Sequence, residues 1–165
     1  MKYLNKTHIL VAVLITLFTT IGNAQISKAE IRATGLTCSM CSNAINKQLK
    51  SLAEVANVET DLNTNTFTVT LKAGNSLTPF AFKESVEKAG FFIGSLILTV
   101  DSKTAAKSPY ILVKESANIP AEVKIQVLDK GYVADKEFKK LAKTYKSIAT
   151  YASNNEADFH IKVVN

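Results

Sequence analysis

Two cysteines are the residues of this chain best suited to chemistry. Cys38 and Cys41 are the only cysteines among 165 residues, and two residues separate them. Only a deprotonated cysteine sulfur binds a metal ion or acts as a nucleophile. Thiolates are soft donors that select Cu(I) and other thiophilic ions over hard cations. A disulfide between the two would close a loop too short to stabilise a fold much, so the pair indicates binding or redox chemistry.

Other metal-ligating side chains are few. Beyond residue 24, His160 is the only histidine and Met40 the only methionine. One chain therefore cannot build a closed zinc site of four Cys and His ligands. It can build a two-coordinate site for Cu(I) or Hg(II), which leaves room for a partner's thiolate to enter. We interpret Met40 as a packing or exposed residue. We expect His160 to face solvent, because side chains alternate between the two faces of a strand and its apolar neighbours Phe159 and Ile161 point to the other face.

The sequence offers little for an enzyme. It contains no recognisable Ser/His/Asp set, paired acid cluster or phosphate-binding glycine loop, and one histidine leaves most general-base schemes without their usual agent. We expect no catalytic residue and no organic cofactor. A thiol-disulfide oxidoreductase using Cys38 and Cys41 is one alternative, although Ser39 and Met40 do not match the aromatic-Cys-Gly-Pro-Cys loop of thioredoxin-like proteins. An interaction protein with a plain disulfide or vestigial cysteines is another.

The N-terminus has the pattern of a secretory signal. Lys2 and Lys6 precede an apolar run over residues 9–21 and a small-residue stretch, so cleavage is expected between Ala24 and Gln25. The run is shorter than the roughly 20 residues of a spanning helix, and an uncleaved anchor is the alternative. Removing two lysines and no acids lowers the formal charge from +6 to +4. We expect a periplasmic or secreted protein without the dense basic and aromatic surface of nucleic-acid binders.

The spacing of apolar residues predicts the elements that position the cysteines. A short strand leads through a loop to Cys41, which is expected to begin a helix with Ile45 and Leu49 on its buried side. Thr78 and Pro79 are expected to start a second helix. The expected strands are residues 27–33, 55–61, 66–71 and 96–100. The order β-α-β-β-α-β predicts an α+β, ferredoxin-like sandwich.

A second unit is expected after the first. Residues 102–109 are polar and small and are interpreted as a linker, which ends a first domain at 25–101. Residues 110–165 are predicted to form a small α+β domain of unknown role, with strands and one helix from Asp135. One side of that helix is basic, and its lysines are Lys136, Lys139, Lys140, Lys143 and Lys146. We interpret this side as a solvated surface; the alternative is that it docks to an anionic membrane or an acidic partner.

The cysteine segment resembles a known family. Residues 35–42 read Gly-Leu-Thr-Cys-Ser-Met-Cys-Ser, which is similar to the Gly-Met-Thr-Cys-x-x-Cys loop of the heavy-metal-associated domain family. The resemblance covers about residues 27–101 and includes Ala-Gly-Phe at 89–91. It departs at Leu36, where the family has a packing methionine, and at 53–55, where Ala-Glu-Val replaces Gly-Val.

The resemblance implies a site and a function. It implies a compact domain that binds Cu(I), or sometimes Zn(II), Cd(II) or Hg(II), through Cys38 and Cys41 and exchanges it with a donor or acceptor protein. Phe91 follows the second helix where the family covers the metal loop, and core packing is its other interpretation. The sequence thus predicts an exported, non-enzymatic protein that sequesters or relays Cu(I). The nearest alternative is a mercury scavenger, since the domain also resembles the periplasmic mercury-binding family, whose chains stop after one domain.

Overall fold

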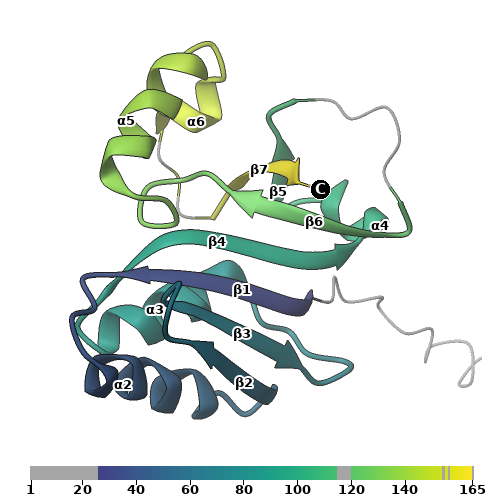
Figure 1. Cartoon of the computed structure of the whole chain (residues 1–165). Coiled ribbons are helices and arrows are strands. Elements are labelled where there is room, and N and C mark those ends of the chain that lie inside the picture. Colours follow the sequence, from purple (N-terminus) through teal and green to yellow (C-terminus); the bar gives the residue numbers. More distant parts are fainter. Residues whose placement is uncertain (1–25, 115–119, 154, 156, 165) are drawn as a thin grey trace, which may run out of the picture.

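A computed structural model describes residues 26–114, 120–153, 155 and 157–164 of the chain (Figure 1). The predicted signal segment 1–24 and its cleavage point lie outside the described residues. Within these described ranges, no helix is both long and apolar enough to cross a membrane.

Seven strands and five helices form the described structure. The strands are β1 (Ile26–Thr34), β2 (Val55–Asp61), β3 (Thr66–Leu71), β4 (Phe92–Asp101), β5 (Tyr110–Leu112), β6 (Glu122–Val127) and β7 (Phe159–Val164). The helices are α2 (Ser39–Lys50), α3 (Pro79–Lys88), α4 (Ser102–Ala105), α5 (Asp135–Thr144) and α6 (Ala149–Ser153).

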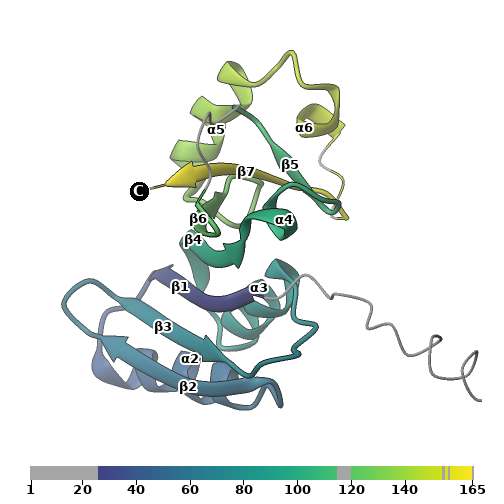
Figure 2. The ribbon, with the colours of Figure 1, turned by 90° about the vertical axis from the view of Figure 1, so that its right-hand side faces the viewer.

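The first half has the predicted ferredoxin-like fold. Strand β1 lies between β3 and β4 and pairs antiparallel with both, and β2 pairs with β3. Helices α2 and α3 contact each other and cover one face of this sheet (Figure 2). The strand order β2-β3-β1-β4 and the two helices confirm the βαββαβ prediction.

Two element boundaries differ from the predictions. Helix α2 begins at Ser39, so Cys41 lies within its first turn rather than at its start. Strand β4 begins at Phe92 instead of Leu96. The pairing of β1 with β4 shifts register between Arg32 and Ala33, and such a bulge interrupts the alternation by which strands are recognised in a sequence.

The sheet continues directly into the second half. Strand β6 pairs antiparallel with β4 from Leu96 opposite Val127 to Asp101 opposite Glu122. Strand β7 pairs antiparallel with β6 and parallel with β5, giving the full order β2-β3-β1-β4-β6-β7-β5. The segment 102–109, predicted as a linker, contains helix α4. The units predicted at 25–101 and 110–165 therefore share one seven-stranded sheet.

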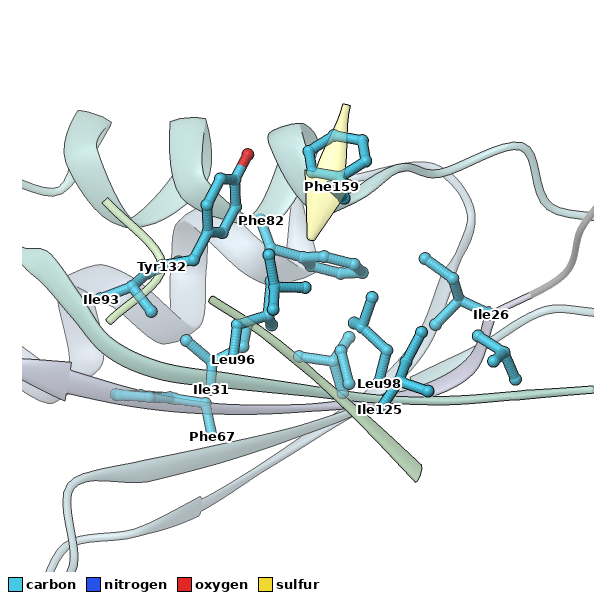
Figure 3. Close-up of a cluster of buried hydrophobic side chains, with 14 of the residues drawn as sticks. Ile26, Ile31, Phe67, Phe82, Ile93, Leu96, Leu98, Ile125, Tyr132 and Phe159 are labelled. Atoms are coloured by element: carbon cyan, nitrogen blue, oxygen red, sulfur yellow. The ribbon is translucent and has the colours of Figure 1, made fainter. Parts of the chain in front are cut away.

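They also share one hydrophobic core. Leu98 of β4 and Ile125 of β6 are opposite each other and fully buried, and Figure 3 shows their side chains together in the same cluster. Phe159 and Tyr132 from the second half join this cluster, with their ring centroids 5.8 Å apart. Burial of large apolar side chains is the main favourable term in folding, so the two halves stabilise each other.

His160 is buried, and the prediction that it faces solvent is wrong. Its side chain is 1% exposed, its Nδ1 atom is 2.7 Å from Oδ1 of Asp129, and its Nε2 atom is 2.9 Å from Oγ1 of Thr150. The ring of Tyr151 contacts it edge-on at 4.9 Å. Helix α6 supplies Thr150 and Tyr151, so the face of β7 that carries His160 is covered at this residue. Alternation along a strand identifies two faces but does not show that one of them meets water.

The prediction of one helix after residue 135 is also wrong. The helix that begins at Asp135 ends at Thr144, and α6 follows after a short turn. The ring of Tyr145 lies edge-on to that of Tyr151, with centroids 5.7 Å apart. This aromatic contact folds the chain back at a place where the sequence has neither glycine nor proline, which is why the break was not predicted.

Candidate metal centre

The cysteines lie on the loop that joins β1 to α2. Gly35 follows β1 with a φ of +87°, a backbone conformation that side-chain-bearing residues rarely adopt. Leu36 packs against the core, as expected of a residue that replaces a packing methionine. Cys38 is the N-cap of α2, with extended backbone and no capping hydrogen bond from its side chain. The loop thus turns at Gly35, is held to the core by the packing of Leu36 and places Cys38 at the N-terminal end of α2.

The structure brings the two sulfur atoms together. The Sγ atoms of Cys38 and Cys41 are 3.0 Å apart, well beyond the roughly 2.05 Å of a disulfide bond, and both cysteines are free thiols. Cys38 is exposed and Cys41 is partly exposed. The pair can therefore be reached from solvent without any movement of the core.

The surroundings favour the thiolate form of Cys41. Its pKa is lowered, first by the hydrogen bond from the Cys38 side chain and then by the Thr37 backbone, while burial acts in the opposite direction. The direction agrees with the expectation for the first turn of a helix, where backbone N–H groups point at the side chain. Thr37 was missed by the sequence reasoning as a thiolate-stabilising residue; its place directly before Cys38 was the available signal.

The spacing of the sulfur atoms bears on how an ion would be held. With bonds of about 2.3 Å, the length of a zinc–thiolate bond, two sulfur atoms in linear coordination would stand roughly 4.6 Å apart. The observed 3.0 Å is shorter, so one sulfur atom must move outward to form a linear site. The Cys38 side chain is exposed and makes no capping hydrogen bond, so its rotation would break only the contact with Cys41.

The neighbouring residues add no third ligand. In the part of the chain that the structure describes, no group of three or more His, Cys, Asp and Glu residues is placed to hold a metal ion. The side chain of Met40 is 81% exposed, as interpreted from the sequence. Phe91 packs against the core, as one of its two interpretations holds, and lies 3.9 Å from where a Cβ atom on Gly35 would stand. Among the described residues, the two thiols are therefore the candidate ligands.

A cavity of about 590 Å³ lies beside this half of the molecule, between α3 and the loop from β6 to α5. Its walls include Thr34 and Phe92 at the paired ends of β1 and β4, together with Lys83 and Asp129. This cavity was not predictable from the sequence, because its walls come from distant segments. Its lining carries side chains of both charges and does not define one class of ligand.

A ferredoxin-like domain with two accessible thiols on its first strand-to-helix loop is the arrangement of a soft-metal-binding domain. Residues 30–92 match the family model described as a heavy-metal-associated domain. The chain belongs to the heavy-metal-associated domain family through this segment, as the resemblance predicted. None of the curated proteins compared with the chain matches it.

Solved structures of related domains cover the same part of the chain. The yeast copper transporter domain CCC2A, solved in apo and Cu(I)-loaded states, is 38% identical over 39% of this chain and 86% of that chain, with a TM-score of 0.36. A chain in the solved Atx1–Cu(I)–Ccc2a complex is also 38% identical over 39% of this chain and 86% of that chain, with a TM-score of 0.35. The N-terminal domain of a potential copper-translocating P-type ATPase from Bacillus subtilis, Cu(I)-loaded, is 33% identical over 41% of this chain and 82% of that chain, with a TM-score of 0.36.

Proposed function

We propose that this protein is exported and that it sequesters or relays Cu(I), bound by Cys38 and Cys41. The observation that carries the proposal is the accessible pair of thiols 3.0 Å apart on the loop before α2. Two soft donors, one with a lowered pKa, suit a monovalent thiophilic ion. The Cu(I)-loaded states of the yeast and Bacillus subtilis domains support the choice of copper.

Relay to another protein is part of the proposal. A two-coordinate ion leaves positions open for an incoming thiolate, and the exposure of Cys38 lets a partner approach along the loop. Transfer then proceeds by stepwise exchange of one thiolate for another, as in thiol exchange reactions. The solved Atx1–Cu(I)–Ccc2a complex supports a protein partner for a domain of this family.

The metal test uses the chain from Gln25 onward, reduced and free of oxygen. Titration with Cu(I) against a coloured Cu(I) chelator should give one bound ion per chain. Cys38→Ser and Cys41→Ser should each lose most of this affinity, because one thiolate cannot hold the ion against the chelator. Met40→Leu is the matched control, since it changes the exposed sulfur between the cysteines and should keep the affinity. Equal uptake by the double cysteine variant contradicts the proposal.

Two further measurements separate the alternatives. Stronger retention of Hg(II) than of Cu(I) in competition would make the chain a mercury scavenger instead. Catalytic reduction or oxidation of a model disulfide, lost in Cys38→Ser, would make it a thiol-disulfide oxidoreductase. Cu(I) binding without such turnover is the expected result.

Export has its own test. When the full chain is expressed in a bacterium, the periplasmic fraction should hold a protein whose mass corresponds to a start at Gln25. An intact N-terminus in the cytoplasmic or membrane fraction would refute export while leaving metal binding untouched.

A further inference from the structure

Helix α5 carries a row of four lysines that the metal site does not use. We name Lys136, Lys139, Lys140 and Lys143 the α5 lysine stripe; all four are exposed. At about 100° of rotation per residue, their spacing confines them to an arc of about 100°. Lys146, exposed in the turn after the helix, adds charge next to the stripe.

The opposite side of α5 attaches the helix to the protein. Phe138 lies with its ring centroid 6.0 Å from that of Tyr151, and Leu141 is half-buried beside it. No residue of α5 is fully buried, so the helix lies on the surface. The contact with Tyr151 fixes its rotation, and the lysine stripe is held pointing outward.

Two acids border the stripe at the spacing of helical neighbours, Asp135 four residues before Lys139 and Glu137 three before Lys140, and they offset only part of its charge. Asp135 and Glu137 in the first turn fall outside the arc of the lysines. The ion pairs found among the described residues join Lys88 to Glu84, Lys124 to Glu30 and His160 to Asp129, and none of these involves the stripe. Four positive charges at helical spacing therefore face solvent together.

The composition of the stripe favours a lipid surface over a protein partner. Protein interfaces are enriched in arginine and aromatic residues and depleted in lysine. The arc contains only lysine, and the whole chain has 19 lysines but a single arginine, Arg32. Lysine is a strongly hydrated point charge without the planar fork that recognises one carboxylate. Such a row suits the diffuse negative charge of anionic headgroups, where each lysine contributes about 1 kcal/mol.

We infer that the α5 lysine stripe docks this protein onto an anionic phospholipid surface. Docking is electrostatic and peripheral, because the apolar side of α5 is already used against Tyr151. In both views of the ribbon, α5 and α2 lie at opposite ends of the molecule (Figures 1 and 2).

The test is cosedimentation of the chain from Gln25 onward with phosphatidylglycerol vesicles, with phosphatidylcholine vesicles as the neutral reference. The stripe variant is K136Q/K139Q/K140Q/K143Q. The charge-matched control is K47Q/K50Q/K88Q/K107Q, which removes four exposed lysines from the rest of the surface. Circular dichroism and tyrosine fluorescence verify that both variants are folded.

The wild-type chain should bind the anionic vesicles and not the neutral ones. At about fivefold per lysine, the stripe variant should lose partitioning on the order of 500-fold, and the control far less. Salt at 0.5 M should release the wild-type chain, since screening shortens the range of the attraction. An equal loss in the two variants overturns the inference, because net charge alone would then explain binding. Binding to soluble polyglutamate without binding to the vesicles also overturns it, in favour of an acidic protein partner.

Discussion

Replacing Ile125 by alanine tests whether the two halves of the sheet unfold as one unit. Ile125 lies in β6, is fully buried, and stands opposite Leu98 of β4 and Val163 of β7. Truncating an enclosed isoleucine removes its buried carbons and leaves a cavity, which costs about 3 kcal/mol of unfolding free energy. With a urea slope of about 1.5 kcal/mol/M, the unfolding midpoint should fall by about 2 M.

Two probes report separately on the two halves. The chain has no tryptophan, and its described tyrosines all lie in the second half, at positions 110, 132, 145 and 151. Tyrosine fluorescence therefore follows the second half, and amide hydrogen exchange in β1 and β3 follows the first. In Ile125→Ala both should lose the same free energy, because β4 joins the halves through the core.

The matched control is Ile97→Ala. Ile97 precedes Leu98 on β4, points to the opposite face of the sheet and is only partly buried, so the same truncation should cost less than half as much. Unchanged protection of β1 and β3 in Ile125→Ala, beside a shifted tyrosine transition, would refute the reasoning. The halves would then be two domains that merely touch.

Two further predictions concern Cys41 and Asp129. In Cys38→Ala the pKa of Cys41 should rise, since the largest cause of its lowering is the Cys38 side chain. The rate at which iodoacetamide alkylates Cys41 should then reach its midpoint at higher pH, whereas the control Ser39→Ala should leave this midpoint in place. An unmoved midpoint in Cys38→Ala would contradict the assigned cause. Asp129→Ala should cost about 2 kcal/mol in urea unfolding, because the buried His160 loses hydrogen bonds from its backbone nitrogen and its Nδ1 atom to the carboxylate. Asp129→Asn should cost clearly less, since its oxygen still accepts from the backbone N–H of His160 and its amide can donate to the other histidine tautomer. Equal losses in the two variants would mean that the charge of Asp129, not its hydrogen bonds, matters.

Much of the first half was predictable because its signals are local. The Cys-x-x-Cys spacing, the Thr78–Pro79 start of α3 and the alternation of β3 each depend on residues close in sequence. Gly90, with a φ of +86°, follows the end of α3, and a glycine at this place is a local signal for a helix end. The start of a helix close to Cys41 was predictable as well, although the helix begins two residues earlier than expected, at Ser39. The bulge near Ala33 was not predictable, because the partner strand decides where a register shift falls.

The second half shows where such signals end. Strand β4 is an edge strand of the isolated ferredoxin-like order, and its free N–H and C=O groups can pair with any strand. Its pairing with β6, and the parallel pairing of β5 with β7, therefore depend on distant packing rather than on the sequence of either strand. The burial of His160 likewise depends on α6 covering a face that alternation alone assigned to solvent.

The sequence by itself determined the pair of thiols and their place between a strand and a helix, because both depend on residues close together in the chain. The tertiary structure decided the context: one continuous sheet, a buried histidine, and an outward lysine row at the end of the molecule opposite α2. The physical reason is that helix caps, turns and sulfur spacing are set within a few residues, whereas strand partners and covered faces are set by burial of apolar area across the whole chain.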